Sequence, residues 1–245
     1  MTRKPFAITG AILAVLIPVA ASGALAPPRE ARPKTVPFDD ARLKIEFNAT
    51  DGDAGLQFFI DAETWRRVTV TNPRGRKIAE FDAGPVIRNF GLSELFSESS
   101  EPPFAELPFA EFKKLFPAGV YTFRGRDIDG QMLKSTFRLT HVVPDGPRIT
   151  SPAEDATLPP TGVTVRWDPV TTPAGIHVVA YEVIVVADES GLGTAERTVD
   201  ATLPATATHL HVPAEFLTPG DYKTEVLAIE RSGNQTLTEV AFTVT

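Results

Sequence analysis

Three aspartates and an asparagine stand close together in one segment and carry oxygen atoms that a calcium ion can bind. The segment NATDGDAGLQFFIDAE begins at Asn48 and contains Asp51, Asp53 and Asp61. Calcium takes about six to eight hard oxygen ligands, and carboxylates are among the commonest. The helical calcium-loop pattern is not met, because the twelfth position counted from Asp51 is Ala62, where that pattern has a glutamate. The other interpretation is an Asp-Gly turn between two strands, which needs the same residue types for backbone reasons.

Other metal or catalytic chemistry has weaker support in the sequence. His209 and His211 alternate along a predicted strand and so share one face, but only His141 and His177 remain as further histidine ligands. An ordinary polar strand face is therefore expected there. No serine stands in a G-x-S-x-G context, and the chain has no cysteine. We expect no catalytic residues, no enzyme activity and no cofactor other than the calcium considered above.

Residues 86–116 hold six phenylalanines in what would be a short crossing of a minimal β-sandwich. Phe109, Phe112 and Phe116 lie at helical spacing, and a proline stands before and after this stretch, which predicts a two-turn helix with an aromatic face. One interpretation is a lid that buries the rings over the first domain. The other is a ligand or partner surface at Phe104, Phe109 and Phe112. Exposed aromatic patches are unfavourable in water, which favours the lid.

Composition and charge exclude several classes of partner. The formal net charge is −7, with 24 Lys and Arg against 31 Asp and Glu, and no basic run occurs. Binding to nucleic acid or to anionic lipid is therefore not expected. Arg74, Arg76, Arg124 and Arg126 stand in or beside predicted turns, and we expect them to balance the acidic residues. The 22 prolines fit many turns and short strands better than long helices.

The N-terminus has the pattern of an export signal. Residues 1–26 begin with Arg3 and Lys4, continue with an apolar run and end with small residues. The alternative is an uncleaved membrane anchor, since 21 residues from Phe6 to Ala26 could just span a bilayer. We expect an exported protein, periplasmic or extracellular. A Pro-rich linker is expected over residues 27–40.

One device occurs twice in the chain and predicts two domains. An apolar-Pro pair, Ala-Glu-Phe, an apolar residue, Pro, Gly, one further residue and a tyrosine precede a strand in each half, ending at Tyr121 and Tyr222. Pro and Gly turn the chain between sheets, and the tyrosine hydroxyl can bond the backbone near that corner. The Pro-Asp-Gly-Pro stretch at 144–147 separates the halves. We predict β-sandwiches over 41–143, with the Phe-rich insertion, and over 147–245.

The second half resembles a fibronectin type III or related bacterial immunoglobulin-like domain. The matching pieces are PRITSP for strand A, VTVRWDPV with Trp167 for strand B, AYEVIVVAD with Tyr181 for strand C, HLHVP for strand E, then LTPGDY and a closing TEVAFTVT. Residues 37–141 resemble the same sandwich more loosely. The resemblance implies an all-β fold of two tandem immunoglobulin-like β-sandwiches, used as a spacer, adhesion or accessory module. It carries no common active site.

The sequence thus favours an exported, non-catalytic binding or structural module of the bacterial envelope or the extracellular space. The alternative is a Ca²⁺-stabilised carbohydrate-binding or adhesive module that uses the loop with Asp51 and Asp53. A protein or carbohydrate partner is expected in either case. A membrane is expected as a partner only if the N-terminal segment stays uncleaved.

Overall fold

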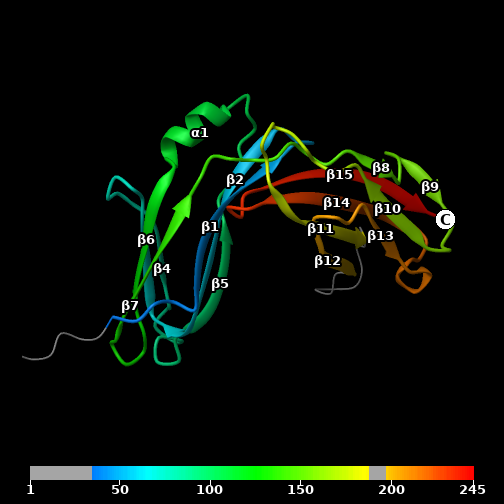
Figure 1. Ribbon diagram of the computed structural model, residues 1–245. Coiled ribbons are helices and arrows are strands. Elements are labelled where there is room, and N and C mark those ends of the chain that lie inside the picture. Colours follow the sequence, from blue (N-terminus) through cyan, green and yellow to red (C-terminus); the bar gives the residue numbers. More distant parts are fainter. Residues whose placement is uncertain (1–34, 188–196) are drawn as a thin grey trace, which may run out of the picture. The chain divides into compact units, whose positions relative to one another are not determined.

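The computed structural model describes residues 35–187 and 197–245 (Figure 1). The predicted signal at 1–26 and most of the predicted linker lie outside the described residues. Within the described ranges, no helix is long and apolar enough to cross a membrane.

The first half of the chain folds into two antiparallel sheets with one short helix between them in sequence. One sheet has the order β1-β2-β5, and the other has the order β4-β3-β6-β7. The elements are β1 (Asp40–Asn48), β2 (Asp53–Trp65), β3 (Arg67–Thr71), β4 (Lys77–Asp82), β5 (Leu92–Glu98), α1 (Phe109–Leu115), β6 (Gly119–Arg126) and β7 (Met132–Leu139).

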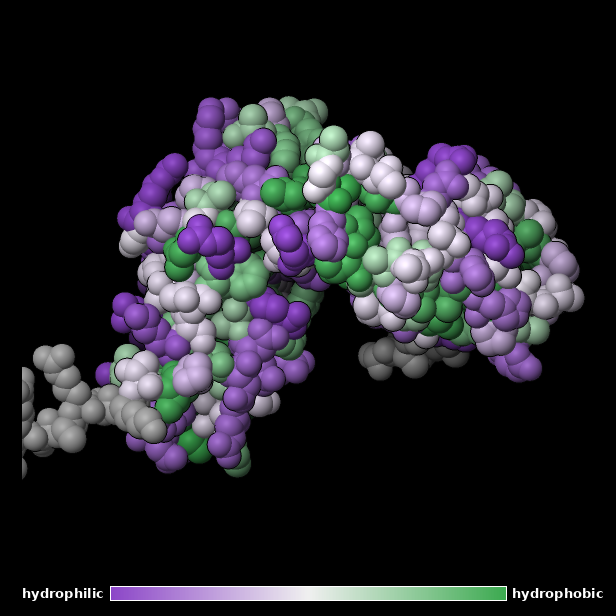
Figure 2. All heavy atoms as spheres, viewed as in Figure 1, coloured by the Kyte–Doolittle hydropathy of each residue, from purple (hydrophilic) through white to green (hydrophobic). Residues whose placement is uncertain are grey.

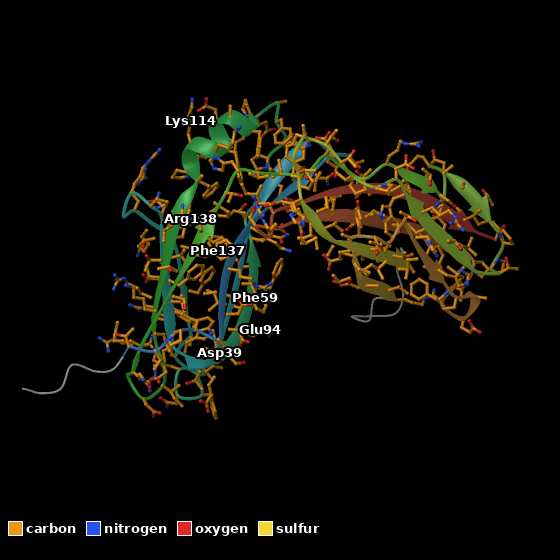
Figure 3. The ribbon with its side chains drawn as sticks, viewed as in Figure 1. Asp39, Phe59, Glu94, Lys114, Phe137 and Arg138 are labelled. Carbon is orange, nitrogen blue, oxygen red and sulfur yellow. The ribbon has the colours of Figure 1, made fainter. Side chains whose placement is uncertain are left out.

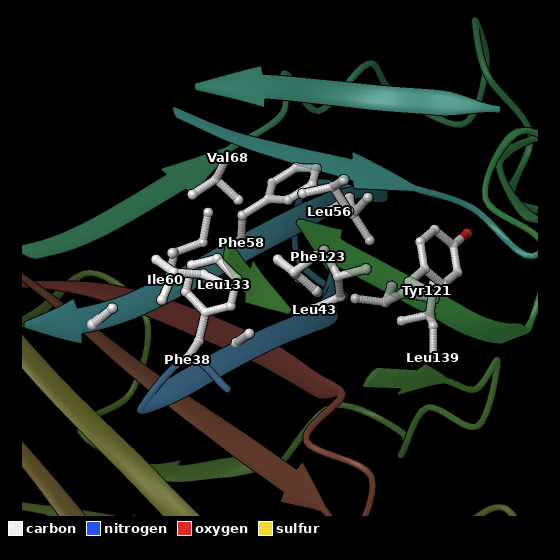
Figure 4. Packing of buried hydrophobic residues seen from close by; sticks show 14 of the residues in the cluster. Phe38, Leu43, Leu56, Phe58, Ile60, Val68, Tyr121, Phe123, Leu133 and Leu139 are labelled. Carbon is white, nitrogen blue, oxygen red and sulfur yellow. The ribbon is translucent and has the colours of Figure 1, made fainter. Parts of the chain in front are cut away.

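The core of this first sandwich lies between the two sheets (Figure 4). Along β1, the buried Ala41, Leu43 and Ile45 alternate with the more exposed Arg42 and Lys44, and β2 shows the same alternation from residue 58 to residue 62. Successive side chains of a strand point to opposite faces, so this alternation is what a sheet with one packed face requires. Phe38 is also buried, although it precedes β1, so the core takes in the end of the predicted linker.

Helix α1 covers the open end of this core, and five phenylalanine rings meet there. Phe112 is 2% exposed, and Phe104, Phe109 and Phe116 pack against the same cluster. Ring centroids lie 4.9 Å apart for Phe47 with Phe104 and 5.2 Å apart for Phe47 with Phe109. The predicted helix is confirmed, and its aromatic face points inward as the lid interpretation requires.

The second half repeats the arrangement with its own core. A three-stranded sheet has the order β13-β10-β8, and the facing strands run in the order β12-β11-β14-β15, with β9 paired to β15. The elements are β8 (Ile149–Ser151), β9 (Ala156–Leu158), β10 (Val163–Trp167), β11 (Val178–Ala187), β12 (Thr198–Pro204), β13 (His209–Val212), the 3-10 turn η1 (Ala214–Phe216), β14 (Gly220–Glu230) and β15 (Gln235–Val244).

Both predicted tyrosine corners are present. The Tyr222 hydroxyl donates to the Thr218 carbonyl oxygen at 2.9 Å and accepts from the Thr218 N–H at 2.8 Å. The Tyr121 hydroxyl donates to the carbonyl oxygen of Pro117 at 3.0 Å. Each tyrosine therefore bonds the backbone four residues upstream, and both rings are at most 2% exposed. Burial raises the pKa of the Tyr121 hydroxyl to about 12.

Strand order confirms the fold expected from the sequence. In each half, the first, second and fifth strands form one sheet and the third, fourth, sixth and seventh form the other, when the short β9 is set aside. Trp167 on β10 and Tyr181 on β11 are buried in the second core with ring centroids 5.4 Å apart. The chain is thus all-β and consists of two tandem fibronectin type III-like sandwiches with a short helical insertion in the first.

The two sandwiches share one sheet. Strand β1 of the first pairs in parallel with β15 of the second, with Glu46 opposite Gln235 and Asn48 opposite Leu237. The combined sheet therefore runs β12-β11-β14-β15-β1-β2-β5. The Ala49 N–H extends the pairing by donating to the Leu237 carbonyl oxygen at 2.9 Å.

A buried amide at the start of β15 fixes this pairing. Asn234 is 1% exposed, and its Oδ1 accepts from the buried backbone N–H of Ile45 at 2.9 Å. Its Nδ2 donates to the carbonyl oxygens of Thr140 and Val142 at 3.2 and 2.8 Å. One side chain of the second sandwich thus holds both β1 and the chain that leaves β7.

The predicted boundary lies in the segment that connects the two cores. Thr236 Oγ1 donates to the Pro144 carbonyl oxygen at 2.6 Å, and the Asp145 N–H donates to the Thr172 carbonyl oxygen at 3.0 Å. The connection is therefore bonded to the second sandwich. Independent folding of 41–143 and 147–245 stays a prediction.

We expect Asn234→Ala to lower the free energy of unfolding by about 1–3 kcal/mol, because it leaves the buried Ile45 N–H and two carbonyl oxygens without their partner. Urea unfolding measures the loss. Asn89→Ala is the matched control, since Asn89 is exposed and its replacement is expected to stay within about 0.5 kcal/mol. Equal effects of the two substitutions would contradict the role given to Asn234.

Candidate functional site

The outer face of the β1-β2-β5 sheet carries most of the chemically interesting side chains of the first sandwich. Residues directly opposite each other on neighbouring strands form rows across this face. The rows run from an acidic one, through an aromatic one and a mixed one, to a second acidic group. In order they are Asp40, Asp61 and Glu94; Arg42, Phe59 and Phe96; Lys44, Gln57 and Glu98; and Glu46 with Gly55.

Three glutamates converge at one end of this face. Glu46, Glu98 and Glu101 each place a carboxylate oxygen within 4.8 Å of the other two. Gln57, which is 5% exposed, donates from Nε2 to Glu98 Oε1 at 2.7 Å. Glu101 folds over Gly55, where a Cβ atom would lie only 2.6 Å from Glu101 Oε1. The glycine is therefore required for this position of the carboxylate.

The crowding of these carboxylates changes their titration. Burial, followed by the charges of Glu98 and Glu46, raises the pKa of Glu101 from 4.5 to about 7. Burial also raises the pKa of Glu46 and of Asp53. Asp53 Oδ1 and Glu101 Oε1 are buried and have no hydrogen-bond partner among the described residues. Binding of a proton or of a cation would reduce the repulsion between these carboxylates.

The predicted calcium residues are only partly brought together. Asn48 Oδ1 accepts from the backbone N–H groups of Thr50 and Asp51, so it closes the turn between β1 and β2. Asp53 lies close enough to the glutamates for its charge to raise the pKa of Glu101. Asp61 is eight positions further along β2, roughly 26 Å away at about 3.3 Å per residue. Asp61 and Asp53 therefore cannot bind one ion.

A groove adjoins the aromatic row of the outer face and has a volume of about 210 Å³. Phe59, Phe96 and Phe137 line it together with Arg42, whose guanidinium carbon lies 4.6 Å from the centre of the Phe59 ring. Phe59 and Phe137 are labelled in Figure 3. Phe96 is 56% exposed. Hydrophilic residues cover much of the first sandwich around smaller hydrophobic areas (Figure 2). Exposed apolar side chains beside a groove often mark a binding site.

The polar residues of the groove lie at the joint between the sandwiches, where β1 pairs with β15. Lys44 Nζ donates to Gln235 Oε1 at 2.9 Å, and Gln235 Nε2 donates to a carboxylate oxygen of Glu46. Burial lowers the pKa of Lys44. Gln235, Lys44 and Gln57 all line the groove, so the pairing that joins the two sandwiches also sets its shape.

The predicted ligand surface at Phe104, Phe109 and Phe112 needs correction. Phe112 is buried, and the other two rings pack against the first core under the lid described above. The rings left exposed by the Phe-rich segment are instead Phe90 and Phe96, at 77% and 56%. Helical spacing identified the aromatic face of the helix but not the side on which the core lies.

The histidines are not gathered at one site. His209 and His211 are exposed on β13, and His211 Nδ1 lies 3.2 Å from Thr164 Oγ1. His141 Nε2 contacts the Phe116 carbonyl oxygen at 2.7 Å at the end of the first sandwich. An ordinary polar strand face thus accounts for the pair on β13.

We expect Glu101→Gln to raise the melting temperature at pH 8 and to change it much less near pH 5. The folded state keeps the Glu101 proton up to about pH 7, whereas the unfolded carboxyl releases it near 4.5. Stability therefore falls as the pH rises through this interval, and the neutral amide removes that loss. Glu94→Gln, exposed on β5, is the control. An equal shift at both pH values would contradict this account of Glu101.

Comparison with known proteins assigns neither a family nor a function to this chain. No protein-family model and no curated protein matches the sequence. Among solved structures, the chicken CNTN1 FN1–FN3 domains match over 86% of this chain and 65% of that one, with 10% identity and a TM-score of 0.30. A tetra-tandem repeat in the extending region of a large adhesion protein matches over 84% of this chain and 50% of that one, with 17% identity and a TM-score of 0.29. The fold assignment itself rests on the strand order and the two tyrosine corners described above.

Proposed function

We propose that the protein is an exported, non-catalytic binding module that holds an extended segment of a partner protein along strand β5. The observation that carries this proposal is Phe96, which is exposed on the last strand of the combined sheet and lines the groove beside Phe59. A sandwich of this kind has no active site given by its fold. The arrangement of side chains at the groove supports binding.

Strand β5 offers main-chain groups to a partner. It ends the sheet in the described part of the chain, so one of its edges pairs with no other described strand. An extended peptide can add to such an edge through main-chain hydrogen bonds, while pockets for alternate side chains supply specificity. Glu94 and Glu98 on β5 discourage pairing between two copies of the edge, because like charges would then face each other.

The side chains of β5 define the partner that fits. Glu94, Phe96 and Glu98 alternate on the outer face, with the aromatic ring between two carboxylates. A complementary strand therefore has an apolar residue at one position and a basic residue two positions before and after it. Arg42, which also lines the groove, gives further hydrogen-bond donors.

Export belongs to the same proposal. Its support is the basic start, the apolar run and the small residues of the segment 1–26. We infer a periplasmic or extracellular location from this signal, and a bacterial envelope from the resemblance of the second half to bacterial immunoglobulin-like domains.

Selection from a phage-displayed peptide library tests the binding site. We expect enriched peptides to alternate basic, apolar and basic residues, and Phe96→Ala to weaken their binding about tenfold or more, since it removes a large apolar contact. Phe90→Ala is the control, because Phe90 is more exposed but lies outside the groove.

Two results would overturn the proposal. One is selected peptides that bind the Phe96→Ala and Phe90→Ala variants equally well. The other is an absence of peptide binding together with binding on a glycan array, which would assign the groove to carbohydrate.

A calcium-stabilised carbohydrate-binding or adhesive module is the second candidate. It is favoured by the partnerless buried oxygens of Asp53 and Glu101 and by the neighbouring oxygen of Gln57 Oε1, which is also buried without a partner among the described residues. These groups lie close to carboxylates that already repel one another. A cation would bind all of them favourably.

Calorimetry with calcium chloride and with chelator tests this second candidate at pH 8. If calcium binds, it raises the melting temperature of the wild-type protein, and Asp53→Asn reduces the increase. Asp61→Asn is the control, because Asp61 lies too far along β2 to share the ion. No change in melting temperature with calcium would remove this candidate and leave the peptide proposal standing.

A further inference from the structure

A second pocket, on the other sheet of the first sandwich, is lined by five arginines. It has a volume of about 390 Å³ and lies at the end of the β4-β3-β6-β7 sheet where β6 turns into β7. Small-molecule sites typically have volumes of about 300–1,000 Å³. The arginines are Arg66, Arg67, Arg88, Arg124 and Arg126.

Strand pairing brings these arginines together from distant parts of the sequence. Arg67 on β3 lies opposite Arg126 on β6, and Thr69 lies opposite Arg124. Residues at alternate positions of paired strands share one face, so Arg67, Arg124 and Arg126 all stand on the outer face of the sheet. Like charges in directly opposite positions are unfavourable. The pair Arg67 and Arg126 persists because other interactions of the fold outweigh this repulsion. An anion bound between the two guanidinium groups would reduce the repulsion.

The acids of the pocket do not neutralise these arginines. Asp82 accepts from both Arg67 and Arg88. Asp127 uses Oδ1 to accept from the Gln131 N–H at 2.7 Å and so closes the turn between β6 and β7. Asp82 and Asp127 are the acidic residues that line the pocket, and Glu80 beside it forms an ion pair with Arg67 at 4.0 Å, so five arginines face two lining carboxylates and one neighbouring carboxylate. The protein as a whole is acidic, with a net charge of −7.

Arg66 and Arg124 have N–H donors that the described residues leave without an acceptor. Arg66 Nε is buried and has no hydrogen-bond partner among the described residues. Arg66 and Arg124 make no ion pair within the described part of the chain, whereas Arg126 donates to the Gly130 carbonyl oxygen at 3.0 Å. A buried guanidinium donor without an acceptor is unfavourable by a free energy comparable to a lost hydrogen bond. A ligand oxygen at this place would satisfy it.

We propose that this pocket binds a small oxyanion carrying at least two negative charges, as a free anion or as a phosphate or sulfate ester. Guanidinium groups present several N–H donors in one plane and match the oxygens of phosphate and sulfate. Met132 and the stems of the arginines supply an apolar wall beside the charged heads. The pocket shares no lining residue with the groove beside β5.

Isothermal titration with inorganic phosphate, sulfate and glucose 6-phosphate at low ionic strength tests the pocket. We expect saturable binding that weakens as sodium chloride is added. Tighter binding of the ester than of inorganic phosphate assigns the site to esters, and equal binding assigns it to the free anion. Arg124→Gln and Arg66→Gln are each expected to weaken binding about tenfold, the effect of one lost hydrogen bond to a charged group.

Arg138→Gln is the matched control. Arg138, labelled in Figure 3, is exposed on β7 of the same sheet but does not line the pocket. Because Arg124 is exposed and makes no ion pair within the described residues, its variant is expected to fold as the wild type does, which circular dichroism checks. The proposal is overturned if the wild-type protein binds none of the three anions. It is also overturned if Arg124→Gln weakens binding no more than Arg138→Gln.

Discussion

The buried amide of Asn234 is the interaction on which the arrangement of this protein depends. It accepts from the N–H of Ile45, which stands 189 residues earlier in the chain, and it donates to the segment that leaves the first sandwich. Because an amide has both an acceptor and donors, one side chain satisfies an N–H group of β1 and two carbonyl oxygens of the segment that follows β7. Its burial excludes water as a competing partner, which makes the geometry specific. The parallel pairing of β1 with β15 then continues one sheet through both sandwiches.

This joint has consequences for the outer face of the first sandwich. Lys44 and Glu46 on β1 are drawn toward Gln235, which bonds to both of them and lies next to Asn234. Their positions set one wall of the groove, and Glu46 in turn contributes to the crowding that raises the pKa of Glu101. Relative motion of neighbouring domains is the default expectation unless the interface between them is large. Here the second sandwich helps to form the surface of the first.

The sequence predicts those features of the fold that are determined by residues close together in the chain. The Pro-Gly corner ahead of Tyr222, the alternation that buries Thr224 and Val226, and the helix at Phe109 are each specified within a few residues. The sequence could not show which strands pair across the two halves, because register between distant strands leaves no periodic signal. Hence the sequence does not place Arg67 opposite Arg126, and it groups Asp53 with Asp61 rather than with Glu101. The lid at Phe112 is favoured from the sequence only because exposed aromatic patches are unfavourable in water, since a lid and an exposed helix have the same spacing.

Native-state hydrogen exchange at the Ile45 amide tests the central claim most directly. If its N–H donates to a buried Asn234 side chain, it exchanges only on global unfolding, at the same rate as the amides at the centre of the β1-β2 ladder. The Ala49 amide, which donates to Leu237 across the joint, is expected to be protected as well. Rapid exchange at Ile45 and Ala49, while the amides of the β1-β2 ladder stay protected, would show that the sandwiches are not joined through β1 and β15.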